Sequence, residues 1–354
     1  MEFVIPPTMR AAQVLEQGKP VQIVEVPVPE PGNGEVLVKL TLSGVCYTDV
    51  HVRDGDLAFP AQLPITIGHE GVGRVCKIGP GVKQFKIGDR VCCPCFAGSC
   101  GHCTDCLEGW GVACTQLKLS GFMTPGTLAE YYVGDANFLV LVPDGVKDES
   151  AAPICCAGVT AYKALKQSGL RAGQTVVILG AAGGLGNYAV QYALAMGLKV
   201  VGIDKGAEKI ESLKKFEGIT AVDVETDDCR GKVLSLTGGL GAHAAIVFAS
   251  TAKATENALT LVRTRGTVIV VGLAPDPIKV DTVTLALRMI TIRGSLVGTV
   301  TDLREAMDFL AEGKIASRPQ IRKFEEVNSI LDELAAGKAI GRTVAIISPD
   351  EISS

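Results

Sequence analysis

Short runs of alternating hydrophobic and polar residues dominate the chain up to about Tyr132. The runs VQIVEV, EVLVKLTL and DRVCC occupy residues 21–26, 35–42 and 89–93, and the segments between them are rich in glycine and proline. Short β-prone runs bounded by such residues are typical of strands joined by tight turns. The pattern therefore predicts a mostly antiparallel β domain.

From Gln174 onward, strand-like and helix-like runs alternate. The predicted strands are 175–179, 199–204, 244–249 and 266–272, and the predicted helices are 184–197, 207–216 and 254–263. This alternation indicates a doubly wound parallel sheet with helices on both faces, so the fold class is α/β. After residues 289–295, the tail predicts two amphipathic helices and a last strand, at 301–313, 325–338 and 342–347.

One uncharged stretch, from Ala172 to Leu198, is long enough to cross a bilayer. Four glycines interrupt its middle, β-branched residues precede them, and alanine-rich helix formers follow. The stretch therefore predicts strand, turn and helix, and we expect no contact with a membrane.

Composition limits the remaining function classes. The 354 residues favour two domains, and a net charge of −4 argues against a nucleic-acid partner. The N-terminal residues carry no secretion signal, so we expect a cytoplasmic protein. In that compartment, 12 cysteines indicate metal sites or reactive thiols rather than a disulfide framework.

A glycine-rich turn lies between the predicted strand 175–179 and the helix after it. Glycines let a backbone approach a pyrophosphate, which then rests on the N–H groups of the helix N-terminus. The GxxGxxG spacing departs from the usual GxGxxG, and a tight turn without a ligand is the alternative. Asp204 ends the next strand, where a carboxylate would bind the adenosine ribose and favour NAD over NADP. The candidate cofactor-binding residues of the turn are Gly180, Gly183, Gly184, Leu185 and Gly186.

Four cysteines follow the spacing CxxCxxCx7C, at Cys100, Cys103, Cys106 and Cys114. Four thiolates from one loop can enclose Zn²⁺ in a tetrahedron, whereas an iron–sulfur cluster usually requires another spacing. A closed tetrahedron leaves no position for substrate. The loop therefore predicts a structural zinc site.

Three further segments carry a family resemblance: CYTDVH from Cys46, GHEGVG around His69, and CAGVTAYKAL from Cys156. Together with the four-cysteine loop, GAAGGLG and the ending IGRTV, they resemble the zinc-dependent medium-chain alcohol dehydrogenases, especially their tetrameric yeast and bacterial branch. The resemblance implies a GroES-like catalytic domain, 1–157 and 296–354, and a Rossmann domain, 158–295. It also implies two zinc ions per chain, NAD, a small alcohol or aldehyde substrate and a homotetramer.

The resemblance assigns roles to several residues. It implies a catalytic zinc held by Cys46, His69 and Cys156, with Glu70 as a transient ligand. A zinc ion with an open position acidifies a bound water or alcohol. Thr48 and His51 would pass the alcohol proton outward, since a hydroxyl both accepts and donates and histidine titrates near neutral pH. Asp49 would orient His69. Without these motifs, His51 would more often be a surface histidine and Glu70 a solvated carboxylate.

The chain differs from its relatives at two places. Tyr47 stands where many of them carry histidine or arginine beside the pyrophosphate, while Arg342 matches the other pyrophosphate contact and Lys209 can reach the ribose. Leu57 and Cys95 replace two pocket tryptophans of the yeast ethanol enzymes, which predicts a roomier pocket for longer or aromatic alcohols. Cys95, with Cys92 and Cys93, also leaves open a redox centre, although buried structural cysteines are commoner.

Two other functions compete with an NAD-dependent zinc alcohol dehydrogenase. A zinc-free quinone or enone reductase of the same superfamily would need no metal ligands and would usually avoid an acid at Asp204. A non-catalytic protein that retains the fold would tolerate loss of the three catalytic ligands, yet all three are present. Since a fold does not establish a reaction, the choice depends on the site residues.

Overall fold

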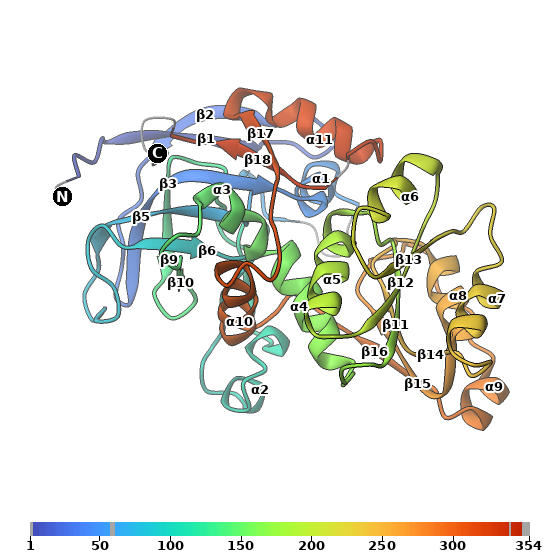
Figure 1. Ribbon diagram of the computed structural model, residues 1–354. Coiled ribbons are helices and arrows are strands. Elements are labelled where there is room, and N and C mark those ends of the chain that lie inside the picture. The colour runs from blue at the N-terminus through green and yellow to red at the C-terminus, as the bar shows by residue number, and fades with distance from the viewer. Residues whose placement is uncertain (1–2, 57–60, 340, 349–354) are drawn as a thin grey trace. The chain divides into compact units, whose positions relative to one another are not determined.

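The computed structural model describes residues 3–56, 61–339 and 341–348. The chain forms two compact units (Figure 1). The first comprises the described residues of Met1–Cys156, Val297–Ala311 and Ser317–Ser354, and the second comprises Ala157–Leu296 and Glu312–Ala316.

The first unit is built mainly from short strands. Its strands are β1 (Thr8–Val14), β2 (Gln22–Pro27), β3 (Glu35–Val45), β4 (Ile65–Thr66), β5 (Gly71–Ile78), β6 (Arg90–Cys93), β7 (Phe96–Gly98), β8 (Lys118–Leu119), β9 (Tyr131–Asp135), β10 (Val140–Leu141), β17 (Gln320–Lys323) and β18 (Thr343–Ile346). Its α-helices are α1 (Tyr47–Asp54), α2 (Thr104–Leu107), α3 (Asp148–Ala151), α10 (Val300–Ala311) and α11 (Val327–Ala335). Short 3₁₀ turns are η1 (Gly111–Ala113), η2 (Ala152–Cys155) and η3 (Phe324–Glu326).

Strand β3 is the centre of the largest sheet of this unit. The strand order is β10-β6-β5-β3-β18-β17, and β9 also pairs with β3. These pairs are antiparallel except for β17 with β18, so the prediction of a mostly antiparallel domain is confirmed. Most side chains of β3 are buried on both faces, which explains its nearly continuous apolar run.

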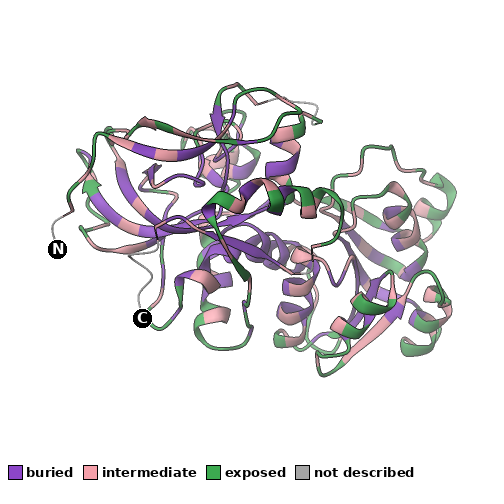
Figure 2. Ribbon diagram, turned by 90° about the horizontal axis from the view of Figure 1, so that it is seen from above, coloured by how far each residue is buried: buried purple, intermediate pink, exposed green. Residues whose placement is uncertain are grey.

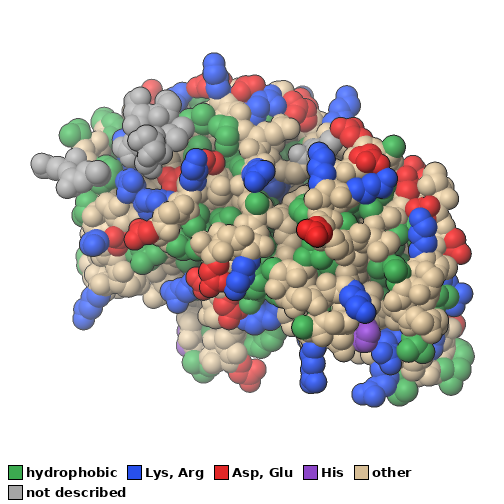
Figure 3. All heavy atoms as spheres, in the orientation of Figure 1, with side chains coloured by type: hydrophobic (Ala, Val, Ile, Leu, Met, Phe, Trp, Pro, Cys, Tyr) green, Lys and Arg blue, Asp and Glu red, His purple; other side chains and the backbone are tan. Residues whose placement is uncertain are grey.

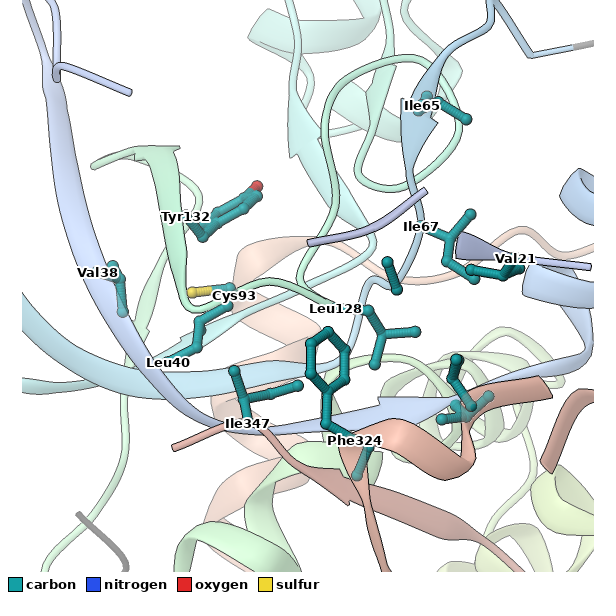
Figure 4. Packing of buried hydrophobic residues seen from close by; sticks show 14 of the residues in the cluster. Val21, Val38, Leu40, Ile65, Ile67, Cys93, Leu128, Tyr132, Phe324 and Ile347 are labelled. Carbon is teal, nitrogen blue, oxygen red and sulfur yellow. The ribbon is translucent and has the colours of Figure 1, made fainter. Parts of the chain in front are cut away.

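The core of the first unit joins distant parts of the sequence (Figure 4). Phe324 and Ile347, from the C-terminal segment, pack into the same buried cluster as Val38 and Leu128 from the N-terminal half. Burying an aromatic side chain such as Phe324 stabilises the packing of the C-terminal segment on the N-terminal half by about 1.5–3 kcal/mol. The C-terminal residues therefore complete a domain that the N-terminal residues begin.

The second unit alternates strands and helices. Its elements are α4 (Ala157–Gln167), β11 (Thr175–Leu179), α5 (Gly184–Ala195), β12 (Lys199–Asp204), α6 (Ala207–Leu213), β13 (Ile219–Asp223), α7 (Cys229–Leu236), β14 (Ala242–Val247), α8 (Ala252–Leu261), β15 (Val262–Val270), α9 (Thr282–Leu287) and β16 (Thr291–Gly294). The six strands are all parallel, in the order β13-β12-β11-β14-β15-β16. The predicted doubly wound parallel sheet is confirmed.

Helices cover both faces of this parallel sheet. Helices α4 and α5 lie on one face and α7 and α8 on the other (Figure 1). Buried residues follow the strands, and exposed residues lie on the outer sides of helices and in loops (Figure 2). All five residues of β11 are buried, as expected for an inner strand that is covered twice.

Several elements differ from the sequence expectations. The predicted helix 325–338 is divided into the 3₁₀ turn η3 and helix α11. Lys323 N donates to Glu326 Oε2 (2.8 Å) and thereby caps the start of η3. The pattern did not indicate α4, β13 or α7, whose apolar positions are short or irregular.

Two features of the structure concern membrane contact and surface charge. Of the helices that the structure describes, none combines the length and the apolar character needed to cross a membrane. Lysine, arginine and acidic side chains are interspersed on the face shown in Figure 3.

Candidate functional site

Cys46 and Asp49 occupy the first turn of α1. Strand β3 ends at Val45, Cys46 has extended backbone angles, and α1 begins at Tyr47. Asp49 Oδ2 accepts a hydrogen bond from Cys46 N (2.8 Å), which satisfies an N–H at the helix start. The other carboxylate oxygen, Oδ1, accepts from Gly68 N (3.0 Å). Asp49 therefore links the start of α1 to the segment that carries His69.

The same carboxylate fixes the orientation of His69. Nδ1 of His69 lies 3.3 Å from Asp49 Oδ1, and both side chains are buried. The opposite ring nitrogen, Nε2, is buried and has no hydrogen-bond partner among the described residues. A buried nitrogen left without a partner costs free energy unless a ligand binds it. This arrangement matches the metal-binding histidines whose second nitrogen is held by a carboxylate.

Four candidate ligands converge at this point. The ligand atoms of Cys46, His69, Glu70 and Cys156 lie within 4.8 Å of one another, and all four residues are buried. Cys156 follows η2, so a segment more than 80 residues from His69 supplies the second sulfur. Two thiols, an imidazole and a carboxylate are the donor types that bind zinc, so the residues fit the predicted ion.

Glu70 forms a buried ion pair with Arg342. Arg342 Nη2 donates to Glu70 Oε1, whereas Glu70 Oε2 and Arg342 Nε have no partner among the described residues. Burial raises the pKa of Glu70 to about 7, and the Arg342 guanidinium opposes this rise. A Cβ atom at Gly44 would lie 2.0 Å from Glu70 Oε2, so this position of β3 has room only for glycine. Arg342, predicted as a pyrophosphate contact, is thus placed beside the metal cluster.

Cys95 borders the same cluster. Its thiol is in hydrogen-bonding contact with Cys156, which lowers the pKa of Cys95 although burial opposes the change. The Cys46 thiol also contacts Cys156, and this contact lowers the pKa of Cys46 well below its usual value. Three sulfurs therefore lie close together. Leu57, the other predicted pocket residue, lies outside the described residues.

The two predicted proton-transfer residues lie on α1. Thr48 is half-buried, and its Oγ1 lies 3.8 Å from Cys46 Sγ. His51 stands one turn further along the helix, and the exposed Tyr47 ring meets it edge-on with a centroid distance of 4.8 Å. The sequence did not single out Asp56, whose Oδ1 lies 2.6 Å from His51 Nδ1.

The four-cysteine loop forms a compact sulfur cluster. The four sulfurs lie within 4.8 Å of one another. Cys100 Sγ is 3.9 Å from Cys106 Sγ, and Cys103 Sγ is 3.8 Å from Cys114 Sγ. A tetrahedron with zinc–sulfur bonds of about 2.3 Å has edges of about 3.8 Å. Backbone N–H groups of His102 and Cys103 donate to Cys100 Sγ and lower the pKa of this thiol to about 6. The loop therefore fits a zinc ion with four thiolate ligands.

In the second unit, the glycine turn joins β11 to α5. Gly180 has φ +81°, which favours glycine, and a Cβ atom at Gly186 would lie 2.0 Å from Gly180 O. Gly183 caps α5 without a side-chain hydrogen bond, so the helix presents free N–H groups. Of the other turn residues, Gly184 and Leu185 form the first positions of α5 and are half-buried. The turn fits a pyrophosphate.

Asp204 lies beside this turn at the end of β12. Its Oδ2 accepts from Ala182 N (2.9 Å), and its Oδ1 accepts from Lys205 N (2.9 Å). Lys209 Nζ lies 3.7 Å from Asp204 Oδ1. The carboxylate is therefore held at the edge of the sheet where parallel-sheet proteins bind dinucleotides.

Comparisons with known proteins agree with this geometry. Residues 32–144 match the family described as alcohol dehydrogenase GroES-like domain, and residues 184–312 match zinc-binding dehydrogenase. The chain is 43% identical over 337 residues to an alcohol dehydrogenase of Rhizobium meliloti, covering 95% of this chain and 98% of the relative. It is 42% identical over 336 residues to an alcohol dehydrogenase of Geobacillus stearothermophilus, with coverages of 95% and 99%. The structure is similar to that of acetophenone reductase from Geotrichum candidum in complex with NAD (TM-score 0.88, 30% identity, coverages of 99% and 100%).

Proposed function

The chain belongs to the zinc-dependent medium-chain alcohol dehydrogenase family, and we propose that it interconverts primary or secondary alcohols with aldehydes or ketones, using NAD. The observation that carries this proposal is the buried cluster of Cys46, His69 and Cys156, in which His69 Nε2 has no partner among the described residues. A zinc-free reductase would have no use for these ligands. A non-catalytic protein would not need to leave a buried nitrogen unsatisfied.

The residues divide the chemistry among them. Cys46, His69 and Cys156 would hold zinc, with Glu70 as an alternative ligand, and the four-cysteine loop would hold a second ion with a structural role. When bound, zinc makes an alcohol hydroxyl more acidic, and NAD accepts the hydride. Asp49 keeps the His69 ring oriented so that Nε2 is free for the ion.

Proton removal depends on the chain's own side chains. Thr48, whose Oγ1 is near Cys46 Sγ, would accept the alcohol proton and donate its own. His51 would then receive a proton at Nε2 and release one to solvent. The positive end of α5 would bind the NAD pyrophosphate, with Asp204 and Lys209 beside the adenosine ribose. Since a carboxylate at Asp204 repels a 2′-phosphate, NADP should be a poor substitute.

A single set of variants tests the proposal. Cys156→Ser and His69→Ala should lose one of about two zinc ions per chain and all measurable alcohol oxidation with NAD. The matched control is Cys229→Ser, because Cys229 is a half-exposed cysteine of α7 outside both clusters. Zinc analysis and initial rates with NAD and NADP are the measurements. Full activity without zinc, or with Cys156→Ser, would contradict the proposal.

The substrate pocket is proposed to favour large alcohols. Cys95 is a small side chain beside Cys156, where a tryptophan would occupy far more volume. We therefore expect catalytic efficiency to rise with chain length or with an aromatic ring. A series from ethanol to octanol, with benzyl and cinnamyl alcohol, tests this expectation, and ethanol as the best substrate would contradict it.

Three broader features are also proposals. The catalytic domain would be 1–157 and 296–354, and the cofactor domain 158–295. The protein would act in the cytoplasm as a homotetramer.

A further inference from the structure

Asp56 forms the closest described contact of His51. The distance from His51 Nδ1 to Asp56 Oδ1 is 2.6 Å, within the range of a strong hydrogen bond. The His51 side chain is 19% exposed and that of Asp56 is 53% exposed. The pair therefore joins a partly enclosed ring to a carboxylate that water reaches.

A fixed turn brings these two residues together. Helix α1 ends at Asp54, and Gly55 follows with φ +70° and donates its N–H to His51 O (2.9 Å). A Cβ atom at Gly55 would also lie 2.5 Å from the side chain of Gln17. The positive φ favours glycine here, whereas the end of the flexible Gln17 side chain could move aside. The turn directs the chain back toward the end of the helix, so that Asp56 meets His51.

The charged groups nearby do not compete for this contact. Arg53 is paired with Asp54 (2.7 Å) and, from helix α11, with Asp332 (2.7 Å). The Tyr47 ring packs edge-on against the His51 ring, with an interplanar angle of 70°. The ring is therefore held by Tyr47 and by the carboxylate at Nδ1. Its Nε2 makes no hydrogen bond to any residue that the structure describes.

We propose that Asp56 is a positioning residue for proton release through His51. The carboxylate accepts the Nδ1–H of the neutral ring, which fixes the tautomer in which Nε2 is the acceptor. When Nε2 takes up the proton that leaves the alcohol, the carboxylate stabilises the doubly protonated ring. The ring then loses one proton to water, and both groups return to their starting states. This inference depends on the proposed role of His51 in alcohol oxidation.

Substitution of Asp56 by asparagine and by alanine distinguishes the effect of its negative charge from the effect of its hydrogen bond to His51. Asp56→Asn keeps an acceptor for Nδ1–H and removes the charge, so kcat for alcohol oxidation should fall roughly three- to tenfold. Asp56→Ala removes both the acceptor and the charge, so kcat should fall further than in Asp56→Asn. Added formate should restore part of the lost kcat. Asp54→Asn is the matched control, because that carboxylate binds Arg53 and not His51. It should leave kcat unchanged.

A double-mutant cycle with His51→Gln gives the decisive result. In the His51→Gln background, Asp56→Asn should have no further effect on kcat, because the group it positions is gone. If Asp56→Asn leaves kcat unchanged while His51→Gln lowers it, the role of Asp56 is wrong and the role of His51 stands. If His51→Gln has no effect, both roles are wrong. An equal effect of Asp56→Asn in both backgrounds, or no rescue by formate, would also overturn the proposal. Zinc content and the NAD-dependent activity of the wild-type protein test the proposed function itself, independently of the role of Asp56.

Discussion

At the scale of single residues, a substitution of Tyr47 is expected to change the affinity for NAD and NADH. Its side chain is exposed. If Tyr47 faces the NAD pyrophosphate, as the family resemblance implies, its phenol would bring no positive charge there. Tyr47→Arg should lower the dissociation constants of NAD and NADH roughly three- to tenfold, since exposed ion pairs contribute up to about 1 kcal/mol. Fluorescence titration of NADH at low and high salt measures this effect. Tyr47→Phe, which keeps the ring against His51, is the control. Unchanged or weaker binding by Tyr47→Arg would contradict the prediction.

Cys95 is the residue that should set substrate size. Cys95→Trp places a large ring beside the Cys156 thiol, so it should reduce the volume available to the substrate. We expect kcat/KM for octanol and cinnamyl alcohol to fall at least tenfold more than kcat/KM for ethanol. Cys95→Ser, which stays small, should keep the original order of substrates. An equal loss for all alcohols would indicate damage to the metal site instead.

The sequence could predict which residues form the metal cluster but not how other side chains complete it. Ligand types and motifs pointed to Cys46, His69 and Cys156, and these residues do lie together. The pairing of Arg342 with Glu70 depends on strand β18 lying against β3, which no local pattern specifies. The contact of Asp56 with His51 depends on the left-handed turn at Gly55, which ends α1 and which the sequence pattern did not indicate.

At the scale of elements, two glycines at the junction of β11 and α5 should have different roles. Gly186 is required by packing, whereas Gly183 matters mainly for cofactor binding. Gly186→Ala would place a Cβ atom 2.0 Å from Gly180 O, so α5 must move. Overpacking of this kind costs about 1–3 kcal/mol, and both thermal stability and NADH affinity should fall. Gly183→Ala meets only Gly180 O at 3.3 Å, so it should lower NADH affinity with little change in melting temperature. Melting curves without cofactor and NADH titrations measure the two effects. Equal melting temperatures for both variants would contradict this assignment.

Strong periodicity and glycine placement made this junction predictable from sequence. Strand 175–179 was predicted with the bounds of β11, and helix 184–197 ends two residues beyond α5. Helix α4 was not predicted, because burial on several sides removes the polar face that marks an amphipathic helix. Nine of the 11 residues of α4, Ala157–Leu165, are buried. Helix α7 was not predicted for the opposite reason: Val233 is its only buried residue, so the segment carries no regular apolar stripe.

The four-cysteine loop can be followed by its own fluorescence signal. Trp110 is the only tryptophan of the chain and lies between Cys106 and Cys114, with 41% of its surface exposed. Cys103→Ser should remove the structural zinc, loosen the loop and shift tryptophan emission to longer wavelength. Cys156→Ser should also remove one zinc ion but leave the emission unchanged. Emission spectra recorded beside zinc analysis distinguish the two sites. A shift in both variants, or in neither, would contradict the separation of the sites.

At the scale of the whole molecule, the parallel sheet ends in an edge that suits self-association. Within the described residues, β16 pairs only with β15, and its side chains are mostly exposed. Leu287, Met289 and Leu296 flank this strand with exposed fractions of 77%, 59% and 50%. An unpaired strand bordered by apolar side chains is a template for pairing with another chain, and a two-fold axis would bring two copies of β16 together.

This edge gives the proposed tetramer a direct test. The wild-type protein should show a mass of four times the 36.9 kDa chain in light scattering. Leu287→Lys combined with Met289→Lys should lower that mass, because two like charges would face their symmetry copies across the strand edge. Leu240→Lys is the control, since Leu240 is also exposed (63%) but lies between α7 and β14. Each chain carries its own metal ligands and glycine turn, so smaller assemblies should retain both zinc ions. A monomeric wild-type protein would contradict the tetramer. An unchanged mass in the double variant would show that the interface does not involve β16.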